Sequence, residues 1–432
     1  MSRGIPDKNL PLGFKVKRNL VQEQLEIIAR RTVEIVPKEE LADKLKRSLT
    51  RRKPLIVKAG FDPSAPDIHL GHVVILKKMR EFQELGHKIV FVVGSFTGMI
   101  GDPSGQSEMR KALTEEEVAR NAETYRSQVT KILDPNQTEF AYNHDWIGKL
   151  TPQQMIELSA KYTVARMLER DDFHIRFQKG HAIGIHELFY PLLQGYDSVI
   201  LKSDIELGGT DQKFNLLVGR ELQRAYGQEP QVTVMMPLLE GTDGIRKMSK
   251  SLNNYIGITE TSSQMFGKVM SLSDDLMFRY YELLTNRSPE EVQRLRQDVA
   301  SGKEHPKEAK VKLAKEIVAE FHGSASAAQA HDEFERIFSE EGLPDDIPNV
   351  VIPTEGPKIW ICKLLVQAGC ASSTSDASRL IQQGAVTIDG QKIRDKNAEI
   401  ACAAKGAEKA PGKKLLLRVG KRQFRSIQFQ SK

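Results

Sequence analysis

Short apolar runs and helical periods in the first 255 residues predict a parallel α/β sheet. Apolar runs at 54–61 and 89–93 flank a helical pattern at 71–85. Strand, helix and strand of this size form a β-α-β unit, whose functional loops follow the carboxyl ends of the strands. Residues 150–225 are predicted to be mainly helical, and the apolar run at 231–239 predicts a further strand.

Beyond Tyr255 the pattern becomes helical up to about residue 340. One helix start is marked by Ser288, Pro289 and Glu291, which supply an N-cap, an N1 proline and a capping box. Four prolines then interrupt residues 341–358, which have no helical period and are predicted to be a linker.

Residues 359–432 contain two helical segments ahead of a small hairpin sheet. The predicted organisation is an α/β domain at 1–255 with an N-terminal extension of about 1–50, an α-helical domain at 256–340, the linker, and a small α+β domain at 359–432.

Charge is distributed unevenly along the 432 residues. The net charge is +6, but residues 358–432 hold 15 Lys and Arg against 5 Asp and Glu, so the rest is mildly acidic. A basic module on an acidic body favours a polyanionic partner such as RNA or DNA.

No stretch approaches the ~20 apolar residues of a membrane span. The N-terminus also lacks the apolar core of a secretory signal. These features predict a cytoplasmic protein that makes no membrane contact. The three cysteines form no Cys-x-x-Cys pair, which argues against disulfides and structural zinc.

Two short motifs carry candidate chemistry, and neither is a P-loop or a G-x-G-x-x-G turn. His69-Leu70-Gly71-His72 follows the first predicted strand. Its two imidazoles lie on one face of an opening helical turn, beside unpaired N–H groups that attract anions. Gly71 allows a ligand to approach the backbone closely. Taken alone, such a pair of histidines could equally be surface or N-cap residues.

The second motif is Lys247-Met248-Ser249-Lys250-Ser251, in a loop after the strand at 231–239. Two lysines three residues apart can clamp a pyrophosphate and neutralise charge on a leaving group. A solvated lysine turn is the simpler interpretation of one such match. The two motifs favour a functional interpretation because both follow strands of the same predicted sheet.

Together the motifs resemble the HIGH and KMSKS signatures of class I aminoacyl-tRNA synthetases. The segments Tyr190–Asp197 and Gly208–Gln212 resemble the tyrosyl branch of that family. The resemblance covers about Leu55 to the C-terminus and implies a Rossmann-like catalytic domain and a homodimer. It also implies ATP, tyrosine and tRNA(Tyr) as partners, with Mg²⁺ on the ATP phosphates and no metal held by the protein itself.

The resemblance assigns roles residue by residue. Asp102, Tyr190 and Gln194 match the residues that hold the amino group of tyrosine, Asp197 matches the acceptor for the phenol, and Gln212 matches the amino-acid side of the pocket. The ATP-binding positions are Gly60, Asp62, His69, Gly71, His72, Gly209, Asp211, Lys247, Ser249 and Lys250. The catalytic positions are His69, His72, Lys247, Lys250 and Arg110.

The chain departs from the family pattern at two positions. Gln106 stands where many members carry a cation, which weakens the expected pyrophosphate clamp. Lys58 stands where many members place a second phenol-binding tyrosine. Lys58 is assigned to the tyrosine site, where it could hold the phenolic oxygen or could pair with Asp197.

The C-terminal segment resembles an S4 RNA-binding domain, with Ser378–Gly390 as its core. The resemblance implies phosphate contacts that position RNA without reading its sequence. The expected tRNA contacts are Arg379, Lys392, Arg394, Lys413 and Lys414.

Three other functions are alternatives to a tyrosine-specific synthetase. A tryptophanyl-type synthetase shares the scaffold, but Asp197 and residues 208–212 favour tyrosine. Another nucleotidyltransferase would have little use for a basic RNA-binding tail, and DNA is not the expected partner. A non-catalytic RNA-binding relative would be expected to lack a histidine or lysine of its signatures, and this chain has them all.

Overall fold

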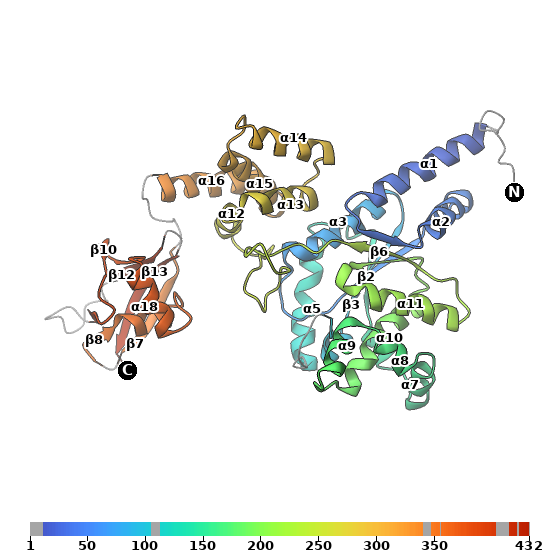
Figure 1. Ribbon diagram of the computed structural model, residues 1–432, viewed down its shortest axis with the longest axis horizontal. Coiled ribbons are helices and arrows are strands. Elements are labelled where there is room, and N and C mark those ends of the chain that lie inside the picture. Colours follow the sequence, from blue (N-terminus) through green and yellow to red (C-terminus); the bar gives the residue numbers. More distant parts are fainter. Residues whose placement is uncertain are drawn as a thin grey trace. The chain divides into compact units, whose positions relative to one another are not determined.

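Figure 1 shows the computed structural model, which describes residues 12–104, 113–339, 347–354, 356–402, 414–420 and 423–431. The chain separates into two compact units. The first consists of residues 1–261 and 268–321, and the second of residues 262–267 and 322–432.

The first unit is built on a six-stranded sheet with the order β1-β6-β5-β2-β3-β4. β1 runs antiparallel to β6, and the other neighbours are parallel. The strands are β1 (Glu34–Val36), β2 (Ile56–Phe61), β3 (Lys88–Val93), β4 (Thr138–Tyr142), β5 (Ile205–Gly209) and β6 (Val232–Met236).

The direction of winding reverses at β2. The chain moves outward from β2 to β3 and β4, and then returns to lay β5 on the other side of β2. At such a reversal the loops after neighbouring strands diverge and leave a crevice at the carboxyl ends. The fold therefore places a binding site after β2 and β5.

Helices connect and cover these strands. They are α1 (Leu12–Ala29), α2 (Lys38–Arg51), α3 (Leu70–Glu84), α4 (Thr97–Ile100), α5 (Glu115–Val129), α6 (His144–Ile147), α7 (Pro152–Ser159), α8 (Val164–Met167), α9 (Asp171–Gln178), α10 (Ile185–Leu201), the 3-10 turn η2 (Thr210–Gln212) and α11 (Lys213–Ala225). The structure confirms the predicted β2-α3-β3 unit and β6. β5 was missed inside the segment predicted to be mainly helical, because five residues ending in two glycines carry little strand signal.

Two glycines fix the position of α10, which carries the predicted tyrosine-binding residues. α10 and α11 run side by side in Figure 1. A Cβ atom on Gly195 would lie 2.8 Å from Leu222 Cδ1 and 3.2 Å from Gly219 Cα. The helices can pack this closely only because both positions lack side chains.

The helical region contains α12 (Ser262–Met270), α13 (Asp274–Leu284), α14 (Pro289–Ala300), α15 (Pro306–His322) and α16 (Ser324–Ser339). The predicted cap of α14 is confirmed, since Ser288 Oγ accepts from Glu291 N and Glu291 bonds back to Ser288 N. The predicted boundaries at 256 and 340 differ from the division into units, because most of these helices group with the sheet whereas α16 groups with the C-terminal residues.

The C-terminal residues form a five-stranded sheet with the order β10-β9-β12-β13-β7 and a two-stranded sheet of β8 and β11. The elements are β7 (Asn349–Thr354), β8 (Lys358–Trp360), α17 (Ile361–Gln367), α18 (Thr374–Gln382), β9 (Val386–Ile388), β10 (Gln391–Lys392), β11 (Glu399–Ala401), β12 (Leu415–Val419) and β13 (Gln423–Ser431).

The predicted linker at 341–358 is wrong for its second half. β7 pairs in parallel with β13 over six residues, and Ile352 belongs to the buried core of this sheet. Its proline, Pro353, is tolerated because β7 is the edge strand and needs fewer N–H donors. An edge strand that contains a proline and lies among other prolines is difficult to distinguish from a linker by sequence.

The N-terminal extension is part of the sheet unit, through β1 and through a buried lysine of α3. Lys78 Nζ donates to the carbonyl oxygens of Ile28 at 3.0 Å and Arg30 at 2.7 Å, and also pairs with Glu81. These carbonyls are the unsatisfied acceptors at the end of α1. Lys78 therefore fastens α1 to the helix that begins with His69 and His72. None of the described helices is long and apolar enough to cross a membrane.

We predict that Lys78→Met lowers the free energy of unfolding by about 3 kcal/mol, because it takes the ammonium group away from buried carbonyls and leaves Glu81 with only the longer 3.5 Å pair to Arg31. Urea unfolding measures the change. Arg80→Met is the matched control on the same helix. Arg80 pairs with Glu84 in solvent, so its loss should cost less than about 0.5 kcal/mol. Equal effects of the two substitutions would contradict the clamp.

Candidate active site

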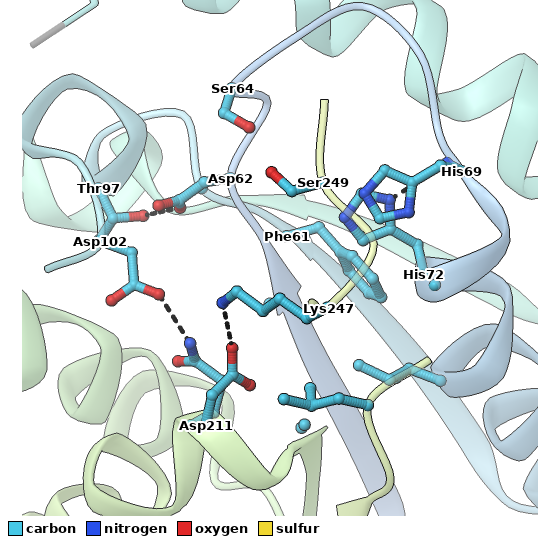
Figure 2. Close-up of a pocket in the computed structure, with 18 of the residues that line it drawn as sticks. Phe61, Asp62, Ser64, His69, His72, Thr97, Asp102, Asp211, Lys247 and Ser249 are labelled. Carbon is cyan, nitrogen blue, oxygen red and sulfur yellow. Dashed lines mark hydrogen bonds and ion pairs between the residues drawn. The ribbon is translucent and has the colours of Figure 1, made fainter. Parts of the chain in front are cut away.

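A cavity of about 590 Å³ opens at the carboxyl ends of β2 and β5 (Figure 2). It gathers predicted residues from across the first unit. The predicted residues that line it are Gly60, Asp62, His69, Gly71, His72, Asp102, Tyr190, Gln194, Asp197, Gly209, Asp211, Gln212, Lys247, Ser249 and Lys250. Lys58 is absent from the lining, and Arg110 and Gln106 lie outside the described residues.

Backbone pairing joins the two signature motifs. Residues 247–251 are called the lysine loop. The residues after it pair with the turn before α3, since Leu70 N donates to Ile256 O and Ile258 N donates to Ile68 O. Met248 is buried, and its sulfur lies 3.3 Å from the N–H of Gly71. The histidines and lysines therefore face one cavity although about 180 residues of chain separate them.

The two imidazoles stack with ring centroids 3.8 Å apart. His72 Nδ1 accepts from the backbone N–H of His69 at 3.3 Å. Burial, with the positive charges of Lys250 and Lys247, lowers the pKa of His72 to about 4 and holds the pKa of His69 well below its usual value. Both rings are neutral at pH 7 and act as hydrogen-bonding groups, so positive charge comes from the lysines.

Each lysine of the loop has a specific partner. Lys247 Nζ lies 2.8 Å from Asp211 Oδ2 (Figure 2). Lys250 donates to the backbone carbonyl of Asp67, and burial lowers its pKa. Ser249 N donates to Asn254 Oδ1 at 2.8 Å. The loop is thereby held with both ammonium groups directed at the cavity.

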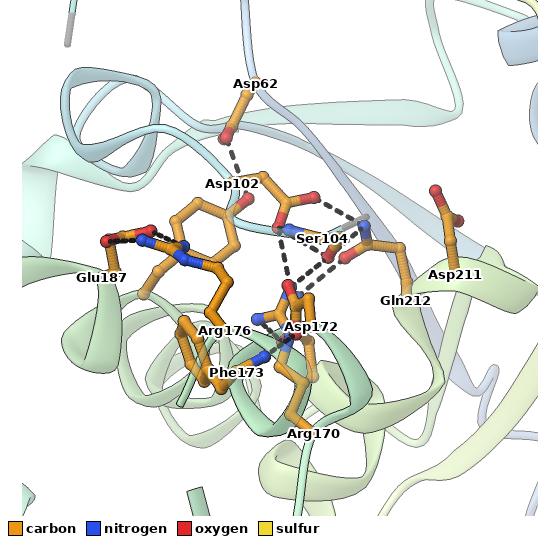
Figure 3. A network of polar contacts seen from close by, with 12 residues as sticks. Asp62, Asp102, Ser104, Arg170, Asp172, Phe173, Arg176, Glu187, Asp211 and Gln212 are labelled. Carbon is orange, nitrogen blue, oxygen red and sulfur yellow. Dashed lines mark hydrogen bonds and ion pairs between the residues drawn. The ribbon is translucent and has the colours of Figure 1, made fainter. Parts of the chain in front are cut away.

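One end of the cavity is acidic (Figure 3). Tyr190 OH donates to Asp62 Oδ2 at 2.8 Å, and Thr97 Oγ1 donates to Asp62 Oδ1 at 2.7 Å. Gln212 Nε2 donates to Asp102 Oδ2 at 2.7 Å. Two carboxylates and a phenol on one wall suit an ammonium group.

Arg170 is a residue that sequence reasoning missed at this acidic end. Its buried guanidinium donates to Ser104 Oγ at 2.6 Å, lies 3.5 Å from Asp102 Oδ1 and pairs with Asp172 at 2.8 Å (Figure 3). Ser104 in turn donates to the same Asp102 oxygen at 2.6 Å. Nothing in the sequence near Arg170 distinguishes it from a charged residue on a helix surface.

Asp197 also lines the cavity and is only 3% exposed. Trp146 Nε1 donates to its Oδ1 at 2.9 Å, and Asn143 Nδ2 donates to its Oδ2 at 3.4 Å. Burial raises the pKa of Asp197 to about 7, although the charge of Lys58 and these two donors act to lower it. Trp146 and Asn143 follow β4, a strand that the sequence analysis did not identify.

Lys58 does not have the role expected of it. Its side chain is buried, and its Nζ lies 2.8 Å from Glu206 Oε1 rather than against Asp197 or the cavity. Gln194, expected to hold an amino group together with Asp102 and Tyr190, donates to the same Glu206 oxygen at 3.3 Å. The strand that carries Glu206 was not predicted, so this partner could not have been foreseen.

Four of the expected tRNA contacts in the C-terminal unit are exposed: Arg379, Lys392, Arg394 and Lys414. Lys392, Arg394 and Lys414 form no ion pair with the described residues, whereas Arg379 pairs with Asp376 at 2.7 Å. Lys392 and Arg418 both stand opposite Thr387 across β9, so they share one face of the sheet. Arg418 had not been identified from the sequence, and Lys413 lies outside the described residues.

No cluster of three or more His, Cys, Asp or Glu side chains among the described residues could hold a metal ion. The carboxylates Asp62 and Asp211 line the cavity but are not joined by a third ligand. An Mg²⁺ ion would fit here only as an ion carried by phosphate oxygens and water, which is a common mode for this metal.

Comparison with known proteins adds two family matches. Residues 50–339 match the model described as tRNA synthetases class I (W and Y). Residues 339–427 match a tyrosine–tRNA ligase SYY-like C-terminal domain.

Individual proteins agree with this. The tyrosine–tRNA ligase of Moorella thermoacetica is 55% identical over 411 residues, which are 95% of this chain and 97% of that protein. That of Syntrophotalea carbinolica is 55% identical over 414 residues, or 95% and 99%. Among solved structures, the tyrosyl-tRNA synthetase of Archaeoglobus fulgidus complexed with L-tyrosine gives a TM-score of 0.57 at 21% identity, covering 72% of this chain and 99% of that one. A truncated mitochondrial tyrosyl-tRNA synthetase of Aspergillus nidulans gives 0.60 at 19% identity, covering 75% and 100%. At these identities the structures support the fold alone.

We predict that Asp197→Asn stabilises the protein at pH 8 by on the order of 2–4 kcal/mol. The pKa of about 7 lies above the value of 3.8 for a solvated aspartate. The folded state therefore holds the proton more tightly, and stability falls as pH rises from about 4 to about 7. Asparagine carries no charge to bury and removes this slope. Urea unfolding at pH 5 and pH 8 tests it, and parallel pH dependences of the two proteins would refute the assignment.

Proposed function

The chain belongs to the class I tRNA synthetases and ligates tyrosine to tRNA at the expense of ATP, and we propose that the cavity after β2 and β5 carries out the chemistry. The observation that supports this assignment most directly is the convergence of both histidines, both lysines and a buried aspartate on one cavity. A tryptophanyl-type activity is not favoured, because the similar full-length proteins are tyrosine–tRNA ligases.

Tyrosine is proposed to lie between the carboxylates of Asp102 and Asp197. Its ammonium group would bind Asp102, Tyr190 and Gln212, and its phenol would donate to Asp197. A buried carboxylate without a donor is costly, so an amino acid without the hydroxyl binds less well. Gln194 lines the same cavity and would contact the substrate from its edge.

ATP is proposed to lie over the turns that follow β2 and β5. Gly60, Gly71 and Gly209 leave room for the nucleotide, while Asp211 would accept from the ribose and Asp62 would border the site. The ion pair between Lys247 and Asp211 would then be exchanged for contacts with the nucleotide.

In the activation step a tyrosine carboxylate oxygen attacks the α-phosphorus, and the bond to the pyrophosphate oxygen breaks. Lys247 and Lys250 would neutralise the charge on the leaving group. His69 and His72, neutral at pH 7, would donate hydrogen bonds, and Ser249 would add another. Positioning and charge stabilisation suffice for this transfer.

Two further groups are proposed for this step. Mg²⁺ on the ATP phosphates would neutralise part of their charge. Arg110, which is outside the described residues, would be a third cation near the pyrophosphate. In the second step a hydroxyl at the 3′ end of tRNA attacks the tyrosyl carbonyl, and AMP leaves.

The tRNA is proposed to contact the basic C-terminal unit through Arg379, Lys392, Arg394, Lys413 and Lys414, with Arg418 as an addition. Lys392 and Arg418 share a face of the sheet. Lysine and arginine side chains on such a face would contact backbone phosphates.

A homodimer is proposed as the assembly. Short helices in the segment 152–185 expose large apolar side chains that a monomer has no reason to present to water. These are Ile156, Val164, Ile175, Phe177 and Ile185. The proposed location is the cytoplasm, where the free cysteines Cys362, Cys370 and Cys402 would stay reduced.

We predict that Lys250→Ala slows tyrosyl-adenylate formation by about 10²–10³-fold, because the ammonium acts on charge that develops in the transition state. Tyrosine affinity should change by less than about threefold. Single-turnover activation and equilibrium binding measure the two quantities. Arg246→Ala, an exposed cation in the same loop that pairs with Asp243, should leave both nearly unchanged. Near-normal activation by Lys250→Ala would rule out the role.

We predict that ending the chain after Asp346 separates the two reactions. The cut removes the C-terminal sheet from β7 onward, with 15 Lys and Arg against 6 Asp and Glu. Pyrophosphate exchange should persist within about threefold, whereas tRNA affinity should fall and depend less on salt as phosphate contacts are lost. Equal losses in both reactions would mean that the C-terminal unit is a stabilising cap. The full-length variant Lys392→Glu should weaken tRNA binding without changing exchange.

A further inference from the structure

Lys58 and Glu206 form a buried ion pair near Asp197, and the proposed mechanism does not use it. Lys58 on β2 and Glu206 on β5 stand opposite each other in the parallel register, and Nζ lies 2.8 Å from Oε1. Both residues have an exposed fraction of 0%. Neither is among the residues that line the cavity.

Glu206 connects this pair to the cavity wall. Its Oε1 accepts from Gln194 at 3.3 Å as well as from Lys58, and its Oε2 accepts from Ser198 at 3.2 Å and from Gln231. Gln194 and Ser198 lie on α10 on either side of Asp197. The carboxylate of Glu206 therefore anchors the turn of α10 that presents Asp197.

The packing around Glu206 leaves little freedom for this anchor. A Cβ atom on Gly219 of α11 would lie 3.3 Å from Glu206 Oε2, 3.0 Å from Ser198 Oγ and 2.7 Å from Gln231 Nε2. The glycine lets α11 close over the carboxylate, which has no space to move when a substrate binds.

The pair also acts on Asp197 through its charge. The charged groups that act on the Asp197 carboxyl are Lys58 from β2, which lowers its pKa, and Glu206 from β5, which raises it. The groups bonded to Asp197, Trp146 and Asn143, are neutral donors. Of the two charges Lys58 has the larger effect on this pKa, so the pair favours the ionised carboxylate that a phenol donor needs.

Stability is a poor explanation for such a pair. Burying two opposite charges gains little over burying two apolar side chains of the same size. What an apolar pair could not supply is an acceptor for Gln194 and a positive charge near Asp197.

We propose that Lys58 and Glu206 are positioning residues that determine selectivity for the phenol, by fixing the turn of α10 around Asp197 and by setting the charge on its carboxylate. This inference rests on the proposed role of the cavity in binding tyrosine. It replaces a direct contact from position 58 to the phenol by an indirect one through the protein.

The test is the pH dependence of the KM for tyrosine in ATP–pyrophosphate exchange, measured with the full-length chain. In the unaltered protein the KM should be lowest above pH 7 and should rise as pH falls, because tyrosine binds the ionised form of Asp197. Lys58→Met should move the midpoint of this rise upward by about one pH unit. The KM at pH 7 should therefore increase about fivefold, because about half of the unaltered protein is already protonated at Asp197 at that pH.

Glu206→Gln should move the midpoint in the opposite direction, because it removes a negative charge and leaves Lys58 with Asp197 as its remaining counter-charge. The double variant should lie between Lys58→Met and the unaltered protein. The KM for phenylalanine, which lacks the hydroxyl, should not follow these midpoints, and kcat for tyrosine should change by less than about threefold in each variant.

Lys44→Met is the matched control. Lys44 is also a buried lysine, but it pairs with Asp204 and Glu229. These two residues precede β5 and β6, at the amino ends of the strands, away from the cavity. Its loss should lower the melting temperature and leave the midpoint unchanged. If Lys58→Met does not fold, Lys58→Arg, which keeps the charge, should retain the original midpoint while Glu206→Gln lowers it.

Midpoints that move in the same direction in Lys58→Met and Glu206→Gln, or that do not move, would overturn the proposal. Such a result would give the pair a structural role only. Failure of the unaltered protein to exchange pyrophosphate with tyrosine would instead contradict the proposed function, so the two failures are distinguishable.

Discussion

The parallel pairing of β2 with β5 is the contact on which the rest of the structure depends. It joins positions 148 residues apart, as the bond between Lys58 and Glu206 shows. Because the chain winds away from β2 on one side and returns on the other, the loops after the two strands diverge and form a cavity. The turn before α3, the η2 turn and the lysine loop all meet there.

Charge in the cavity is divided by environment. The imidazoles are neutral because burial and nearby lysines oppose their protonation. At one end Asp102 is held by Arg170, Ser104 and Gln212. Asp197 is so buried that its pKa rises to about 7. A buried carboxylate of this kind costs stability, because its charged form is poorly solvated.

The lysine loop and the α3 turn are coupled by contacts that a bound nucleotide would have to share. Lys247 is paired with Asp211, and Lys250 is bonded to the carbonyl of Asp67. Backbone bonds between residues 256–258 and 68–70 hold the two segments in register. Both lysines therefore line the cavity in defined positions, and each would exchange its present partner for a contact with a bound nucleotide.

The β2-α3-β3 unit, the helical region with its capped α14, and the signature residues that line the cavity could be predicted from the sequence alone. These features depend on local periodicity, capping chemistry and short motifs, all of which are present in neighbouring residues. Only the tertiary structure decided which partner each side chain meets. Lys58 pairs with Glu206 because an unpredicted strand lies beside β2. Arg170, the residue before α9, contacts Asp102 across 68 residues of chain. Pro353 belongs to an edge strand because β13, much later in the chain, supplies the hydrogen bonds of that strand. Long-range pairing leaves no periodic signal in either partner alone, which is why these contacts could not be predicted from the sequence.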